Sequence, residues 1–299
     1  MYKAFEEILG KENILTDEPM SNHTTFKIGG PADFFLMPET EEQLRRVIEV
    51  SKRNNLSVFI MGNGSNLLVG DKGIRGIVIS LYKKMDKIEV NGEKIYASCG
   101  AVLSRVSSAA LNAELTGFEF ASGIPGTVGG GIFMNAGAYG IEMKDIVESV
   151  RYMDENGEVL EAGAQLCEFG YRKSIFSSKN YIVLGATFKL QKGNKTEISE
   201  KISDFTQRRV SKQPIEKPSA GSVFKRPEGY FAGTLIEDAG LKGFSVGGAE
   251  VSKKHAGFII NKGGATAKDV LDLIKHIQTV VYEKNGVMLE TEVRTVGEF

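Results

Sequence analysis

The chain has 299 residues, of which 25% are charged, and its 37 lysines and arginines nearly balance its 38 aspartates and glutamates. This balance argues against a broad nucleic-acid-binding surface, so any bound anion must be held by a local arrangement of groups. No apolar run approaches the length of a membrane span and the N-terminus lacks an apolar signal core, which predicts a soluble cytoplasmic protein without membrane insertion. The two cysteines, Cys99 and Cys167, have no metal-ligand spacing, so we expect ordinary thiols and no metal site.

The first part of the chain alternates predicted strands with a helix. We expect strands at the apolar, β-branched runs Asp33–Met37, Ser57–Met61 and Ile77–Leu81. Thr40 is a candidate N-cap, and Gln43 three residues later completes a capping box at the start of a helix. This order predicts an α/β unit, which can contain a parallel sheet.

In the middle of the chain, the apolar pattern predicts short strands around one helix at Val102–Leu115. Val147–Asp154 and Val159–Ala162 flank Asn156-Gly157, which is a strong hairpin signal because both residues tolerate positive φ. Tyr181–Leu190 is an apolar run typical of a buried strand.

The last third begins with a predicted helix at Ile198–Lys212, and a short helix ends near Gly240. Thr266 is the N-cap candidate of the most regular helix, which Gly286 ends, and Val287–Val296 follows as a final strand. The apolar stripe of that helix consists of Val270, Leu273, Ile274, Ile277 and Val281.

These elements predict an α+β fold with three domains, over residues 1–86, 87–194 and 195–284. The second boundary lies near Gly193, where a polar stretch precedes a new helix. We expect the C-terminal segment 285–299 to return to the first domain.

Two glycine-rich loops are the strongest functional signals. The first, at 62–67, follows a strand but lacks a dinucleotide fingerprint because Leu67 occupies the third glycine position, and a structural turn is an equal interpretation. The second, at 123–131, is too glycine-dense for a simple turn, and its backbone N–H groups favour a phosphate-binding nest. The candidate cofactor-binding residues are Gly62, Asn63, Gly64, Ser65, Asn66, Leu67, Gly123, Ile124, Pro125, Gly126, Thr127, Gly129, Gly130, Asn135 and Gly137.

Motifs in these loops and beyond them resemble those of the UDP-N-acetylenolpyruvoylglucosamine reductase family, and they cover nearly the whole chain in order. The compact region between Ala138 and Tyr171 has little room for a long tyrosine-bearing substrate loop, so the chain is most similar to the shorter, second type. The matching segments are Thr24–Ala32, Gly62–Leu68, Gly123–Gly130, Gly170–Arg172, Ala220–Lys225, Lys254–Phe258 and Leu289–Arg294.

The resemblance implies a vanillyl-alcohol-oxidase-like (PCMH-type) FAD-binding fold in the first two domains and a UDP-sugar-binding third domain. It also implies an NADPH-dependent flavoprotein oxidoreductase of peptidoglycan precursor synthesis. NADPH reduces the flavin, and the UDP-N-acetylglucosamine enolpyruvate then becomes UDP-N-acetylmuramate, with hydride from flavin N5 to C3. The FAD is expected to be non-covalent, because Gly62–Leu68 contains no histidine or cysteine.

By the same resemblance, Arg172 and Glu292 stabilise the enediolate-like intermediate and Ser222 gives a proton to C2. Arginine suits a carboxylate because its guanidinium donates two parallel hydrogen bonds, and a protonated glutamate can donate another. Without the motifs, a surface arginine, a turn serine and an exposed strand carboxylate are the ordinary interpretations. The candidate UDP-sugar-binding cations are Lys212, Lys225 and Arg226. We expect the protein to be a monomer.

Two other functions stay open on the sequence alone. One is a different oxidase or dehydrogenase of the same flavin fold, against which the arginine, serine and glutamate motifs argue. The other is a non-catalytic flavin- or nucleotide-sugar-binding protein, which has no need of those three residues.

Overall fold

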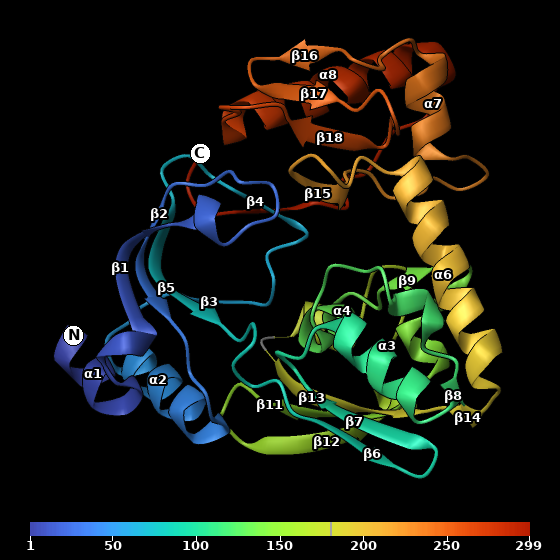
Figure 1. The fold of residues 1–299 in the computed structure, drawn as a ribbon. Coiled ribbons are helices and arrows are strands. Elements are labelled where there is room, and N and C mark those ends of the chain that lie inside the picture. The colour runs from blue at the N-terminus through green and yellow to red at the C-terminus, as the bar shows by residue number, and fades with distance from the viewer. Residues whose placement is uncertain (180) are drawn as a thin grey trace. The chain divides into compact units, whose positions relative to one another are not determined.

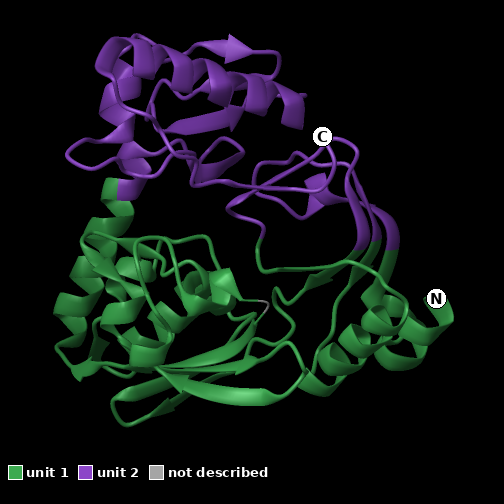
Figure 2. Cartoon of the chain, turned by 180° about the vertical axis from the view of Figure 1, so that it is seen from behind, with its two compact units in different colours: residues 1–15, 34–63, 77–208 green, residues 16–33, 64–76, 209–299 purple. Residues whose placement is uncertain are grey.

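The computed structural model describes residues 1–179 and 181–299 (Figure 1). The chain divides into two compact units, each assembled from three stretches of sequence (Figure 2). Unit 1 comprises residues 1–15, 34–63 and 77–208, and unit 2 comprises residues 16–33, 64–76 and 209–299. The three domain boundaries expected from the sequence stay a prediction.

The first sheet has four strands in the order β1 (Ile14–Pro19), β2 (Pro31–Leu36), β5 (Ile74–Ser80) and β3 (Val58–Met61). Its strands β3 and β5 are parallel. Helices α1 (Tyr2–Leu9) and α2 (Glu41–Arg53) pack against each other in unit 1.

The N-cap predicted for α2 is confirmed, but the capping box is not reciprocal. The Thr40 hydroxyl accepts the Gln43 N–H at 3.1 Å. The Gln43 side chain accepts from the Glu39 N–H instead of the Thr40 N–H, and it donates to the Ile8 carbonyl at 3.2 Å. This second bond to α1 draws the amide away from the position that a capping box requires.

Unit 1 also contains an antiparallel sheet of five strands. Helices α3 (Leu103–Asn112) and α4 (Val128–Phe133) lie over one face of it (Figure 1). The core between them contains Phe118, Ile132 and Phe188. The strand order is β12 (Val159–Gly163), β11 (Val147–Met153), β13 (Ile182–Lys189), β7 (Lys94–Ser98) and β6 (Ile88–Asn91).

The hairpin predicted at Asn156-Gly157 is confirmed as the turn between β11 and β12. Only Gly157 adopts a positive φ, of 87°. The turn is closed by Asp154, whose carboxylate accepts the N–H groups of Asn156 and Glu158.

Unit 2 contains a four-stranded sheet whose strand pairs are antiparallel. Its longest helix, α8 (Ala267–Asn285), packs on β16 and β17, and α7 (Ala232–Asp238) packs on α8. As predicted, Thr266 caps α8, here in a reciprocal box with Asp269, and Gly286 ends it at φ 68°. The predicted apolar stripe is buried. The strand order is β15 (Ser219–Ser222), β18 (Phe258–Asn261), β17 (Ala249–Val251) and β16 (Ser245–Val246).

The predicted final strand Val287–Val296 is wrong over most of its length. Only β19 (Arg294–Val296) is a strand, and it pairs in parallel with β4 (Leu67–Val69). The preceding residues make single backbone contacts with the segment after β15, including an isolated bridge between Phe224 and Thr291. The C-terminus therefore returns to an early segment of the chain through the short parallel pair of β19 and β4.

The remaining elements are short or connect larger ones. Helix α6 (Lys195–Lys212) ends where the sequence predicted. In residues 1–179 and 181–299, no helix is both long and apolar enough to span a bilayer. The short elements are η1 (Lys11–Asn13), η2 (Met20–Asn22), β8 (Leu115–Thr116), η3 (Glu119–Ala121), β9 (Gly137–Ala138), β10 (Ile141–Glu142), η4 (Met143–Asp145), η5 (Ala164–Leu166), α5 (Ile175–Ser178) and β14 (Gln191–Lys192).

Candidate active site

The start of the first glycine loop, at Gly62 and Asn63, meets the second glycine loop within unit 1. The Asn63 side-chain amide donates to the Pro125 carbonyl at 2.7 Å. A Cβ on Gly62 would lie 2.4 Å from the Thr127 hydroxyl oxygen, so no larger residue fits there without moving that side chain. The loop after β3 and the loop before α4 therefore contact each other at Gly62 and Asn63.

Two backbone N–H groups of the second loop already form hydrogen bonds with carbonyls of the protein. The N–H groups of Val128 and Gly129 donate to the carbonyls of Ala101 and Cys99, both at 2.9 Å. These two groups are therefore not available to a phosphate, which corrects the expectation of a nest running through the whole loop. Gly129 is packed against Cys99, whose Cβ would lie 3.1 Å from an added methyl group. Burial raises the pKa of the Cys99 thiol to about 12, so it stays protonated at neutral pH.

Other groups of this loop fit a bound cofactor. Gly126 and Gly130 have no positive φ, and an added Cβ would meet the protein at no less than 3.7 Å. Neither backbone strain nor crowding explains the missing side chains, whereas close approach of a ligand does. Just before Gly123, the buried Ser122 hydroxyl has no hydrogen-bond partner among the described residues. A buried hydroxyl without a partner is costly, so a cofactor oxygen or nitrogen at this position would satisfy it.

Asn135 connects the end of α4 to the Arg172 turn. Its side chain is fully buried, donates to Glu142 Oε2 and the Gly170 carbonyl, and accepts from the Lys144 N–H. All of its ordinary side-chain hydrogen bonds except one acceptor position are thus made within the protein. Direct cofactor binding by Asn135 stays a prediction, and its observed role is to fix the segment that carries Arg172.

Arg172 lies in a tight turn in which Gly170 and Lys173 exchange backbone hydrogen bonds. Its φ of 53° is in the left-handed region, which is uncommon for a residue with a long side chain and typical of functional turns. The guanidinium donates to the Gly137 carbonyl at 3.4 Å and lies 5.1 Å from the Tyr171 ring. The side chain is half-buried, so its charge is held in a defined place rather than left in solvent.

Unit 2 brings Ser222 and Glu292 onto neighbouring segments. The Glu292 N–H donates to the Val223 carbonyl at 2.7 Å, directly after Ser222 in the chain. The Ser222 hydroxyl donates to the Phe224 carbonyl at 3.2 Å, and both candidate side chains are half-buried. Gly221 precedes them at φ 76° with open space around it, so glycine is required there by conformation.

Asn66 ties the first glycine loop to the glutamate. Its side-chain amide donates to the Glu292 carbonyl at 3.1 Å, and its own carbonyl accepts from the Arg294 N–H at 3.0 Å. Cofactor binding by Asn66 stays a prediction, and its observed contacts hold the segment that carries Glu292. Of its neighbours, Leu67 is buried in β4, whereas Gly64 accepts from the Thr25 N–H at φ 62°.

The three candidate substrate cations occupy different settings in unit 2. Lys225 pairs with the exposed Glu290 carboxylate at 2.8 Å. The Arg226 guanidinium lies 4.0 Å from the Phe231 ring centroid, on an exposed loop. Lys212 ends α6 and is exposed.

The structure adds groups that the sequence did not single out. Ser122 and the Ala101 and Cys99 carbonyls complete the surroundings of the second loop. Ser122 directly precedes a recognised motif, but a serine beside glycine is so common in turns that the sequence carries no further signal.

The comparisons with known proteins concern the fold and the family of the chain. The FAD binding domain model matches residues 32–163. A solved variant of Phl p 4, described as a glucose oxidase, is 15% identical with a TM-score of 0.51, covers 65% of this chain and 44% of its own, and supports the fold alone. Fold, loops and family model together define a flavoprotein with an FAD-binding fold of the vanillyl-alcohol-oxidase (PCMH) type, as the sequence predicted.

The particular family follows from the rest of the chain. Residues 213–296 match the UDP-N-acetylenolpyruvoylglucosamine reductase C-terminal domain. The reductase of Alkaliphilus oremlandii is 55% identical over 99% of this chain and 98% of its own, and that of Clostridioides difficile is 54% identical over 100% and 98%. The crystal structure of the Thermus caldophilus reductase is 35% identical with a TM-score of 0.82, covering 95% of this chain and 98% of that one. The chain belongs to the UDP-N-acetylenolpyruvoylglucosamine reductase family.

Proposed function

We propose that this protein reduces UDP-N-acetylenolpyruvoylglucosamine to UDP-N-acetylmuramate, with FAD as cofactor and NADPH as the source of hydride. The observation that carries the proposal is similarity along nearly the full chain to reductases of this name, at 54–55% identity. The three expected catalytic residues are all present within the matching motifs. The product places the enzyme in peptidoglycan precursor synthesis, and we expect it to act as a cytoplasmic monomer.

Bound FAD supplies the hydride that adds to C3 of the enolpyruvyl group. The protein's own task is then to stabilise the negative charge that develops on C2 and the carboxylate. Arg172 is suited to this because its guanidinium can donate two parallel hydrogen bonds to a carboxylate. Its fixed turn means that little reorganisation is needed when the charge appears.

Ser222 is the proposed proton donor to C2. A hydroxyl is a weak acid, but the acceptor is a carbanion-like carbon of high basicity. The new C2–H bond takes the hydroxyl proton, and the serine oxygen regains a proton from solvent. Glu292, held one segment away by the Val223 and Asn66 contacts, is proposed to donate a hydrogen bond to the same intermediate in its protonated form.

Lys212, Lys225 and Arg226 are proposed to bind the diphosphate of the UDP-sugar. The ion pair of Lys225 with Glu290 does not oppose this, because exposed pairs contribute only about 0–1 kcal/mol and can exchange for a phosphate. Arg226 is suited to a planar, bidentate contact with phosphate oxygens.

An anaerobic visible titration of the purified protein tests the proposed function. NADPH is expected to bleach the yellow flavin, and UDP-N-acetylenolpyruvoylglucosamine is expected to restore it with one equivalent of NADPH consumed per sugar. A yellow protein that the sugar cannot reoxidise would overturn the substrate assignment. Failure of FAD to bind on reconstitution would overturn the flavoprotein assignment as well.

A further inference from the structure

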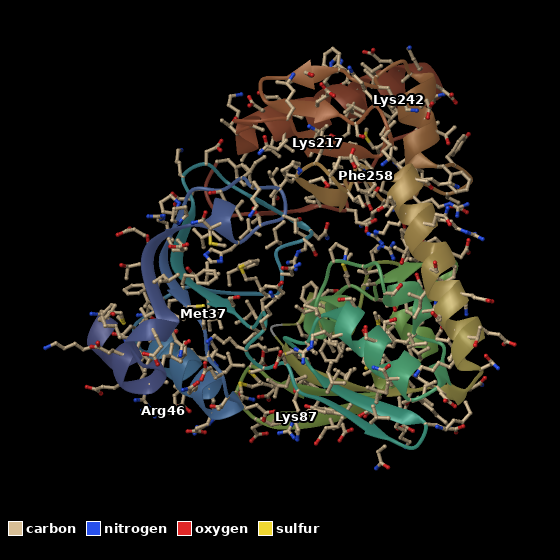
Figure 3. All side chains as sticks on the ribbon, in the orientation of Figure 1. Met37, Arg46, Lys87, Lys217, Lys242 and Phe258 are labelled. Atoms are coloured by element: carbon tan, nitrogen blue, oxygen red, sulfur yellow. The ribbon has the colours of Figure 1, made fainter. Side chains whose placement is uncertain are left out.

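His255 lies close to the proposed proton donor, and it has no role in the chemistry proposed for the site. It lies in the turn between β17 and β18 in unit 2, and Phe258, against whose ring it packs edge to face at 5.0 Å, is labelled in Figure 3. The turn is held by Ser252, whose hydroxyl accepts the N–H groups of Lys254 and His255. The histidine ring therefore has a defined orientation.

The His255 ring accepts a hydrogen bond from one backbone N–H group. The Gly257 N–H donates to His255 Nδ1 at 3.1 Å. A histidine nitrogen that accepts a hydrogen bond carries no proton, so the neutral ring is protonated on Nε2. Protonation of Nδ1 would place two hydrogens in opposition and break this bond.

Gly257 is the link between the ring and the proton donor. A Cβ at this glycine would lie 3.1 Å from His255 Cε1 and 3.5 Å from the Ser222 hydroxyl oxygen, so the glycine separates the two side chains. The Gly257 carbonyl also accepts the Val223 N–H at 2.9 Å. The backbone directly after Ser222 is thus hydrogen-bonded to Gly257, whose own N–H is held by His255.

We propose that His255 is a positioning residue for Ser222, acting through the hydrogen bond from Gly257 to its neutral Nδ1. This inference rests on the proposed function, because it presupposes that Ser222 delivers a proton to the substrate. Protonated His255 releases Gly257, and the Ser222 hydroxyl then loses the support that aims it.

The surroundings of the ring favour the neutral form. Burial lowers the pKa of His255, and the positive charges of Lys242 and Lys212 lower it further, whereas a hydrogen bond with the residue's own backbone and the charge of Glu237 oppose this shift. Lys242 and Glu237 form an ion pair, so their effects on the ring partly cancel. Proton delivery by Ser222 is therefore expected to fail at acidic pH, below the ordinary histidine pKa of about 6.5, where His255 becomes protonated.

Two substitutions separate this role from a structural one. His255→Asn keeps an oxygen acceptor for the N–H two residues ahead, which is the geometry of an Asx-turn, but it does not titrate. His255→Phe keeps a ring against Phe258 and removes the acceptor. His276→Phe is the matched control, because His276 stacks on Phe244 at 4.3 Å and neither residue has a proposed part in the reaction.

Stopped-flow absorbance, with flavin reduction by NADPH and reoxidation by the UDP-sugar followed separately between pH 5 and 8, tests the proposal. His255→Phe is expected to slow reoxidation by up to about 100-fold, as for a misplaced catalytic group, and to leave reduction unchanged. His255→Asn is expected to reoxidise at nearly the wild-type rate at pH 8 and to lack the acidic limb that the proposal predicts for the wild type.

Normal reoxidation in His255→Phe, or an unchanged acidic limb in His255→Asn, would overturn the positioning role. If His255→Phe does not fold, the pH profile of His255→Asn still decides. Failure of the wild-type protein to be reoxidised by the sugar would instead overturn the proposed function itself, so the two failures are distinguishable.

Discussion

The two units hold their candidate residues in different ways. In unit 1, the start of the first glycine loop meets the second loop through close contacts, namely the Asn63–Pro125 hydrogen bond and the approach of Gly62 to Thr127. In unit 2, Ser222 ends strand β15 and Glu292 lies on an irregular segment, whose N–H donates to the carbonyl of the residue that follows Ser222. The first arrangement is a surface shaped by the absence of side chains, and the second positions two reactive side chains.

This contrast predicts that substitutions in the two units affect different properties of the enzyme, either cofactor binding or the reaction with the sugar. Changes at the glycine loops should alter cofactor retention and stability. Changes at Ser222 or Glu292 should leave the flavin bound and act on the reaction with the sugar. Substitution of Arg172 is a test of this contrast, because Arg172 belongs to unit 1 but has a proposed role in catalysis.

Apart from changes at Ser222, Arg172→Lys is expected to have the largest effect on the reaction. Lysine keeps the charge but loses the paired hydrogen bonds to a carboxylate, so flavin reoxidation by the sugar should slow by about 10²–10³-fold. Stopped-flow measurement of both half-reactions checks this, with Lys173→Ala, an exposed neighbour, as the control. Equal slowing of reduction by NADPH would show that Arg172 supports the fold of the turn and not the intermediate.

Gly129→Ala and Gly130→Ala separate packing from cofactor contact. A methyl group on Gly129 meets Cys99 at 3.1 Å, so this variant should lose about 1–3 kcal/mol of apoprotein stability. A methyl group on Gly130 meets only the Thr127 hydroxyl at 3.7 Å, so its apoprotein should be as stable as the wild type but bind FAD more weakly. Denaturant unfolding and FAD titration of both apoproteins give the comparison, and the reverse order would contradict it.

Thr266→Ala should have a small effect that is confined to stability. It removes the N-cap of α8, whose hydroxyl accepts the Asp269 N–H at 3.0 Å, and should cost about 1 kcal/mol. Thr279→Ala on the exposed side of the same helix should change unfolding by much less. Equal losses for the two variants in urea unfolding would argue against the cap as the cause.

Much of the regular structure could be predicted from local patterns. The α8 stripe, its Thr266 cap and its Gly286 end all appear where the sequence indicated, because each depends on residues within one helix. The β11–β12 hairpin is equally local. The strand predicted at Val287–Val296 failed because those residues pair with segments distant in sequence, and no local pattern states that the ladder is interrupted.

The candidate site likewise has features that the sequence predicts and features that it does not. Glycine density marked the two loops, yet it could not show that the Val128 and Gly129 N–H groups are already occupied by Ala101 and Cys99. The proximity of Ser222 to Glu292 was accessible only through the resemblance, since seventy residues separate them in the chain. His255 could not be given a role from the sequence because its partner is a backbone N–H, which leaves no mark there.

The most direct test of this difference between the units is stopped-flow absorbance of both half-reactions in Ser222→Ala. We expect NADPH to reduce the bound flavin at nearly the wild-type rate, whereas the sugar should reoxidise it about 10²–10⁴-fold more slowly, the usual range for loss of a general acid. Equal slowing of both half-reactions would contradict the proposed role, because Ser222 would then be maintaining the structure of the site and not delivering the proton.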